Sequence, residues 1–174
     1  MKAWKELELD GLRWVEVGSY RYELRTQDDE VIATMKRLRW WNSAVEVDAP
    51  GNRWRFERRG WWNRRITIQT AVTGDEPARF EYRGMSSGRL IFADGRAYDW
   101  KQSNFWGTKW AWVTPDGEPF LGFQSGGILR LNAEVSSAPA ARDLPSLALL
   151  VFLGWYLLTL YQEDTAGSTV IVAT

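Results

Sequence analysis

Arginine and tryptophan are concentrated in residues 53–65 (RWRFERRGWWNRR), which hold six arginines and three tryptophans but a single glutamate. Guanidinium groups pair with phosphate oxygens, and indole rings stack on nucleic-acid bases or lie among lipid headgroups. The segment therefore predicts a surface for an anionic ligand, with a phospholipid headgroup favoured over single-stranded nucleic acid. The residues expected to bind this ligand are Arg53, Arg55, Arg58, Arg59, Arg64 and Arg65. Lys36, Arg37 and Arg39 would extend the surface if their strand lies beside it.

The same segment also has the pattern of an ordinary barrel strand. Trp54 and Phe56 alternate with charged residues along the chain. In a strand these two rings would face the interior, and Arg53, Arg55 and Glu57 would be solvated outside. On this interpretation the arginines bind no ligand, and both interpretations stay open at the level of the sequence.

Two pairs of adjacent tryptophans, Trp40-Trp41 and Trp61-Trp62, flank or belong to this basic region. Adjacent residues of a regular strand point to opposite faces, so one ring of each pair should be exposed. An exposed tryptophan could insert at a membrane interface or contact a partner. The alternative is a bulge or loop that turns both rings of a pair inward.

The sequence offers little for catalysis or metal binding. It contains neither histidine nor cysteine, which excludes zinc sites of the usual kinds, Ser-His or Cys-His catalysis, and disulfides. A cation bound by oxygen atoms alone stays open. The candidate carboxylates are Asp94, Asp99, Asp116 and Glu118, and turn formation already accounts for Asp94 and Asp116. We therefore expect a protein that is not an enzyme and that needs no cofactor.

Residues 1–135 have the pattern of many short antiparallel strands. A strand, an acidic turn and an apolar returning strand occur in this order three times, in residues 20–35, 65–82 and 106–124. Asp94-Gly95 is the strongest hairpin signal. The total of about ten to twelve strands is typical of a β-sandwich or a β-barrel.

Residues 144–162 (LPSLALLVFLGWYLLTLYQ) form a long uncharged stretch that predicts a hydrophobic helix. At about 1.5 Å per residue this helix is roughly 28 Å long, close to the ~30 Å hydrocarbon core of a bilayer. A membrane span is therefore one interpretation. However, no cluster of basic residues flanks the segment, and Pro145 suits the first turn of a helix capped by Asp143.

Burial inside the protein is the other interpretation of this helix. A helix that is apolar on every side is typical of one that is enclosed on every side. A barrel of about twelve strands has an interior too wide for its own side chains to fill. The sequence also contains 12 tryptophans, which indicate a wide interior or a long aromatic surface. A central helix would fill the barrel, and the indole rings would pack between helix and wall.

Four features in this order resemble a known group of proteins. They are residues 88–96 (GRLIFADGR), the tryptophan-bearing strand of residues 104–113, the turn Asp116-Gly117-Glu118, and the hydrophobic residues 144–161. The arrangement is similar to that of the tubby-like superfamily, which includes tubby C-terminal domains, phospholipid scramblases and LURP-one-related proteins. The resemblance implies a twelve-stranded closed barrel around a central hydrophobic helix. It also implies phosphoinositide binding through basic residues, as in tubby domains. The chain departs from the scramblases in lacking their calcium segment and palmitoylated cysteines.

The sequence thus predicts one mainly β domain over residues 1–174, a closed antiparallel barrel of about twelve strands around one buried C-terminal hydrophobic helix. Residues 1–135 supply the strands, residues 144–162 the helix, and residues 163–174 a frayed tail or an added edge strand. The expected function is that of a non-enzymatic binding or scaffold module of tubby-like type for anionic lipid headgroups. The alternative is a tail-anchored membrane protein with a cytoplasmic β-domain and a spanning helix at residues 144–162.

The expected location is the cytoplasm, with the protein peripheral to a membrane surface. The N-terminal residues show no apolar signal segment, and cysteine is absent. The net charge is zero, but residues 35–65 carry nine Lys and Arg against three Asp and Glu. An attraction to anionic surfaces would therefore have to be local.

Overall fold

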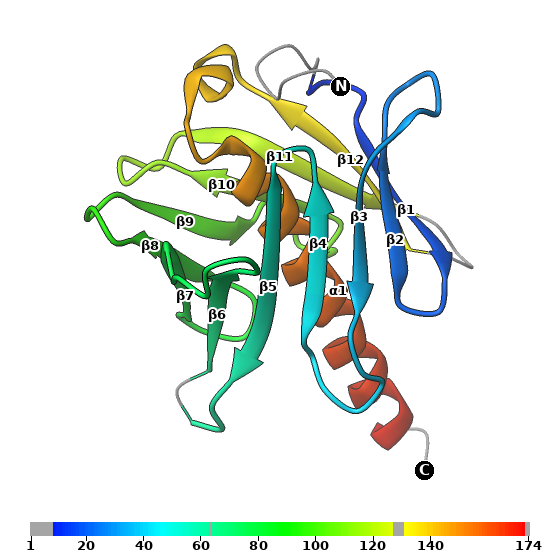
Figure 1. The fold of residues 1–174 in the computed structure, drawn as a ribbon. Helices are drawn as coiled ribbons and strands as arrows, with labels where there is room; N and C mark the ends of the chain where they lie inside the picture. Colours follow the sequence, from blue (N-terminus) through cyan, green and yellow to red (C-terminus); the bar gives the residue numbers. More distant parts are fainter. Residues whose placement is uncertain (1–8, 63, 127–130, 173–174) are drawn as a thin grey trace.

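A computed structural model describes residues 9–62, 64–126 and 131–172, with side chains up to residue 166. Within these residues twelve antiparallel strands follow one another around a closed barrel, and β12 pairs with β1 to close it (Figure 1). The strands are β1 (Arg13–Gly18), β2 (Arg21–Arg25), β3 (Val31–Arg37), β4 (Val45–Ala49), β5 (Asn52–Arg59), β6 (Arg65–Thr70), β7 (Ala78–Tyr82), β8 (Gly88–Phe92), β9 (Ala97–Gln102), β10 (Lys109–Val113), β11 (Pro119–Gly126) and β12 (Asn132–Ser137). Among the described residues one α-helix, α1 (Leu147–Val172), runs through the inside of the barrel, so the predicted fold class is confirmed.

Alternation along each strand decides which side chains fill the barrel. One row of register partners crosses five consecutive strands, and all of its side chains are buried. The row consists of Val45, Phe56, Ile68, Ala78 and Phe92. Polar residues beside them in sequence point away from the lumen, which gives the strands the alternating pattern that predicts them.

Helix α1 is hydrophobic on every side because the barrel surrounds it, and residues 147–160 are all buried. Trp155 stacks on Trp14 of β1, with ring centroids 5.4 Å apart and an interplanar angle of 6°. From β10, Trp112 donates its indole N–H to the carbonyl oxygen of Leu150 over 2.9 Å. Large aromatic side chains therefore span the space between the wall and the helix.

The helix begins at Leu147 rather than at residue 144. A short 3₁₀ helix, η2 (Pro139–Asp143), comes first. Pro145 precedes α1, and Asp143 ends the 3₁₀ helix instead of capping α1, so the predicted roles of both residues are wrong. The physical reason is the proline ring, which disfavours helical geometry in the preceding residue. Leu144 is indeed extended, with φ −72° and ψ 124°.

The helix also continues past residue 162, its predicted end, as far as Val172. Residues 163–172 are therefore helical, and the expectation of a frayed tail or an edge strand is wrong for them. This segment contains no proline to interrupt the helical hydrogen bonds. Its first two residues, Glu163 and Asp164, form ion pairs with arginines of the barrel.

The two ends of the barrel differ, because successive strands run in opposite directions and their connections alternate between ends. Helix α1 enters where β12 finishes and leaves at the opposite end, close to the β3–β4 connection (Figure 1). We call residues 19–20, 38–44, 60–62, 64, 83–87 and 103–108 the helix-exit end. We call residues 26–30, 50–51, 71–77, 93–96 and 114–118 the helix-entry end.

The tight fit of helix to barrel generates a prediction at Gly154. A Cβ atom at this residue would lie 2.5 Å from Cζ of Phe123, whose ring is buried. Overpacking of this kind costs about 1–3 kcal/mol, and the intrinsic helix preference of alanine offsets about 1 kcal/mol. We expect Gly154→Ala to lower the free energy of unfolding in denaturant by up to about 2 kcal/mol.

A double variant provides the control. Phe123→Leu removes part of the ring that obstructs the new methyl group. The loss in Gly154→Ala/Phe123→Leu should therefore be smaller than the sum of the two single losses. Strictly additive losses would contradict a direct contact between these two residues.

Candidate functional site

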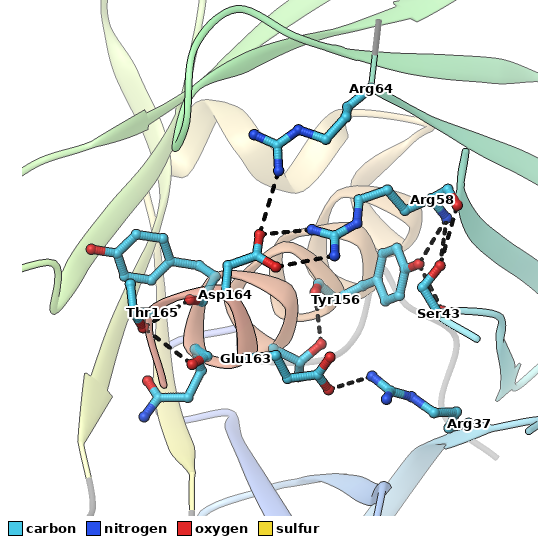
Figure 2. Close-up of polar contacts among 11 residues, drawn as sticks. Arg37, Ser43, Arg58, Arg64, Tyr156, Glu163, Asp164 and Thr165 are labelled. Atoms are coloured by element: carbon cyan, nitrogen blue, oxygen red, sulfur yellow. Dashed lines mark hydrogen bonds and ion pairs between the residues drawn. The ribbon is translucent and has the colours of Figure 1, made fainter. Parts of the chain in front are cut away.

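Arg58 connects the barrel wall to α1 at the helix-exit end. Its two terminal nitrogens donate to the two carboxylate oxygens of Asp164, over 2.7 and 3.1 Å, and Arg64 lies 3.6 Å from the same carboxylate (Figure 2). Two parallel hydrogen bonds of this kind are the strongest form of arginine–carboxylate pairing. Burial alone would lower the pKa of Arg58, but the bonds to Asp164 outweigh it and the pKa is raised.

A second ion pair fixes β3 to the helix. Arg37 donates to Glu163 (Figure 2), and its guanidinium carbon lies 4.2 Å from the centroid of the Tyr20 ring. The Arg37 side chain is almost fully buried. The two carboxylates that follow the apolar part of α1 are therefore both held by arginines of the barrel.

Tyr156 connects two neighbouring parts of the wall through the helix. Its hydroxyl donates to the backbone oxygen of Ser43 over 2.8 Å and accepts from the backbone N–H of Arg58 over 3.1 Å (Figure 2). Burial raises the pKa of this phenol, so the hydroxyl keeps its proton. The contacts fix the β3–β4 connection against β5 at the helix-exit end.

A pocket of about 540 Å³ opens beside these contacts, between the β5–β6 and β7–β8 connections. It is lined by Trp62, Arg64, Arg65, Glu81, Tyr82 and Gly84. The Arg64 guanidinium lies 5.2 Å from the centroid of the Tyr82 ring, and burial raises the pKa of the Tyr82 phenol. Arg79 holds the carboxylate of Glu81 over 2.8 Å. Guanidinium groups and a protonated phenol together suit a ligand that carries phosphate.

The six predicted arginines do not form one continuous surface. Three of them, Arg53, Arg55 and Arg59, project from the outside of β5 and pair with Asp48 or Glu57. Arg58 points inward and pairs with Asp164. Arg64 and Arg65 line the pocket. Arg53 lies about 20 Å from Arg59, because a strand rises ~3.3 Å per residue. The prediction that Trp54 and Phe56 face the interior is confirmed by their burial.

The additional cations of the β3 region do not join this group. Strand β4 lies between β3 and β5, so the condition of adjacency is not met. Lys36 pairs with Glu46 over 3.8 Å. Arg39 lies in the β3–β4 connection, with its guanidinium 5.3 Å from the ring centroid of Trp41.

Both tryptophan pairs lie in connections of the helix-exit end, and all four rings are exposed. The expectation of one exposed ring per pair assumed a regular strand, and neither pair lies in a strand. The alternative, in which both rings of a pair turn inward, is wrong. A third pair, Phe105-Trp106, was expected in a strand but is exposed in the β9–β10 connection. Sequence reasoning missed the signal of this third pair, because two adjacent bulky rings of a strand cannot both face the lumen.

Two of the candidate carboxylates, Asp94 and Asp99, are held by arginines. Arg89 donates to both oxygens of Asp99, over 2.7 and 3.0 Å, and holds the pKa of Asp99 below its usual range. Asp94 accepts from the backbone N–H and the guanidinium of Arg96, within the predicted hairpin turn. In the part of the chain that the structure describes, no group of three or more Asp or Glu residues is placed to bind a metal ion.

Comparisons with protein families, with curated proteins and with solved structures gave no match. The resemblance to the tubby-like superfamily therefore stays a prediction. Among the described residues, no helix has the length and apolarity needed to cross a membrane. The fold and the site together define a class of protein, a helix-filled twelve-stranded barrel with one basic and aromatic end.

The ion pairs at the helix-exit end generate a prediction about stability. Asp164→Ala leaves Arg58 without its bidentate partner, and the Arg58 side chain is only 22% exposed. We expect the free energy of unfolding to fall by about 1–2 kcal/mol, below the ~3–5 kcal/mol of a fully buried pair because solvent screens part of the interaction.

Asp48→Ala is the matched control in the same denaturation experiment. It removes an ion pair with Arg53 whose two side chains are both more than half exposed. Its effect should stay within about 0.5 kcal/mol. Equal losses in the two variants would contradict a specific structural role for Asp164.

Proposed function

We propose that the protein is a non-enzymatic binding module for anionic phospholipid headgroups. The observation that carries this proposal is the pocket at the helix-exit end, where Arg64 and Arg65 lie beside Trp62 and Tyr82. Its volume of about 540 Å³ falls within the range of about 300–1,000 Å³ that is usual for small-molecule sites. A phosphate group fits the guanidiniums, and the rings supply apolar walls for the rest of a headgroup.

The charges of the pocket favour an incoming anion. Arg64 is 3.6 Å from an Asp164 carboxylate that already accepts two shorter bonds from Arg58. A phosphate could therefore gain a closer contact with Arg64 without breaking the Arg58 pair. Within the described residues, no carboxylate lies at ion-pair distance from Arg65. The pocket carboxylate, Glu81, is held by Arg79.

The alternative of a tail-anchored protein has less support. Residues 147–160 are enclosed by the barrel, so this segment could enter a bilayer only by leaving the lumen. That step would expose the inward-facing aromatic side chains of the wall and would break the contacts of Trp112 and Trp155. The burial of the helix therefore argues against a membrane span formed by residues 144–162.

Headgroup binding predicts a specific loss in Arg64→Gln/Arg65→Gln. Each arginine near an anionic surface contributes about 1 kcal/mol, so removal of both charges should weaken binding roughly 30-fold. The measurement is co-sedimentation with phosphatidylcholine vesicles that contain phosphatidylserine or a phosphorylated phosphatidylinositol. The two anionic lipids, compared at equal charge, show whether phosphate esters are preferred.

Arg53→Gln/Arg96→Gln is the matched control, because it removes the same charge from the helix-entry half of the barrel. Both positions are farther from the pocket than the ~8 Å screening length at physiological salt, so vesicle binding should change little. Absence of binding by the wild type to any anionic vesicle, or an equal loss in both double variants, would rule out a headgroup site in this pocket.

A further inference from the structure

The helix-exit end carries a set of aromatic side chains that the barrel does not cover. They are Trp40, Trp41, Trp61, Trp62, Phe105 and Trp106, with exposed fractions between 61% and 91%. Met85, in the β7–β8 connection of the same end, is 83% exposed. Among the described residues of the helix-entry end, Val72 is the large apolar side chain with comparable exposure. We call these six aromatic residues the aromatic rim.

Four rings of the aromatic rim pack on one another in two pairs. Trp40 and Trp41 meet edge to face with centroids 5.6 Å apart, and Phe105 and Trp106 do so at 5.5 Å. Adjacent rings in a loop can contact each other and still present most of their surface to solvent. Large apolar side chains that are exposed together at one end of a barrel are typical of a site of interaction.

The charge of the two ends indicates what the aromatic rim contacts. Among the described residues of the helix-exit connections there are three arginines, Arg39, Arg64 and Arg83, and no carboxylate. The helix-entry connections between strands contain one arginine, Arg96, and eight carboxylates. These eight are Asp28, Asp29, Glu30, Asp75, Glu76, Asp94, Asp116 and Glu118. The barrel is therefore polarised along its axis, with the aromatic rim at the positive end.

Two carboxylates do lie near the positive end, at the point where α1 leaves the barrel. Both are neutralised by the barrel itself, since Glu163 pairs with Arg37 and Asp164 pairs with Arg58. They do not present free negative charge toward a partner. The remaining combination of arginine with exposed tryptophan is typical of the interface between lipid headgroups and hydrocarbon.

We infer that the aromatic rim inserts into the interfacial layer of an anionic phospholipid bilayer, with the barrel axis close to the membrane normal and the acidic end pointing away. The inference rests on the proposed function for the chemistry of the partner. It adds a second contact, made by apolar insertion rather than by headgroup binding. The rim is distributed over three connections around the barrel mouth, which suits a flat membrane surface better than a groove-shaped protein site.

The test uses the full chain and vesicles of phosphatidylcholine with phosphatidylserine, in which part of the phosphatidylcholine carries bromine atoms on its acyl chains. Tryptophan fluorescence should be quenched on binding, because bromine quenches only indoles that reach the acyl region. Trp40→Ser/Trp41→Ser and Phe105→Ser/Trp106→Ser should each weaken vesicle binding by about tenfold or more and reduce quenching. All four side chains are exposed, so we expect these variants to fold as the wild type does. An unchanged thermal unfolding curve would confirm this.

Val72→Ser is the matched control, since it removes an exposed apolar side chain from the opposite end. It should leave binding and quenching unchanged. The insertion proposal is overturned if vesicles bind without quenching, or if the two rim variants bind as the wild type does. It is also overturned if sedimentation shows that the rim variants convert a self-associating protein into a monomer, because the rim would then join copies of the chain.

A soluble inositol phosphate, titrated calorimetrically without vesicles, separates the two proposals. Binding that Arg64→Gln/Arg65→Gln abolishes and the rim variants preserve supports the headgroup pocket whatever the vesicles show. Quenching that survives in Arg64→Gln/Arg65→Gln with unchanged vesicle affinity supports insertion, and it overturns the pocket when the wild type also fails to bind the inositol phosphate. Loss of vesicle binding in the rim variants alone, with inositol phosphate binding retained, supports both contacts.

Discussion

The width of a twelve-stranded barrel is the constraint on which the rest of this structure depends. A closed sheet of this size encloses more space than its inward side chains can fill, and an unfilled apolar lumen would forfeit packing contacts along its whole length. Helix α1 fills that space, which requires it to be apolar on every side. The wall in turn supplies rings large enough to reach the helix, such as Trp14 and Trp112. At Gly154 even a methyl group would overlap the neighbouring side chain of the wall.

Because the lumen is occupied, chemistry is confined to the outer face and the two ends of the barrel. On the outer face, arginines and carboxylates of neighbouring positions neutralise one another, as Arg53 and Asp48 do. The ends differ because up-and-down connectivity sorts alternate connections to opposite ends. Connections rich in aspartate and glutamate gather at one end, and those rich in tryptophan and arginine gather at the other. Acidic connections and basic, aromatic connections alternate along the sequence, and the fold separates them to opposite ends of the barrel.

Alternation and the central helix were predictable because both follow from local pattern. The burial of Trp54 and Phe56 and the turn at Asp94-Gly95 could be derived from neighbouring residues alone. The C-terminal end of α1 could not, since the residues that follow position 162 pair with Arg37 and Arg58, more than 100 residues away in sequence. The arginines of residues 53–65 do not form the continuous surface that the sequence predicted, for a related reason. Consecutive arginines of a strand point to opposite faces, and those six positions apart lie at opposite ends.

The tryptophan content has two explanations in the structure rather than one. Trp14, Trp54, Trp100, Trp110, Trp112 and Trp155 are buried around the helix, whereas five others are exposed at the helix-exit end. Composition cannot separate these groups, because both uses favour large rings.

Trp62 lines the pocket and is also 91% exposed in the aromatic rim. In the proposed function this shared residue places the headgroup site and the inserting rings at one depth. The two contacts belong to one folded barrel, so engagement of either should reduce the entropic cost of engaging the other.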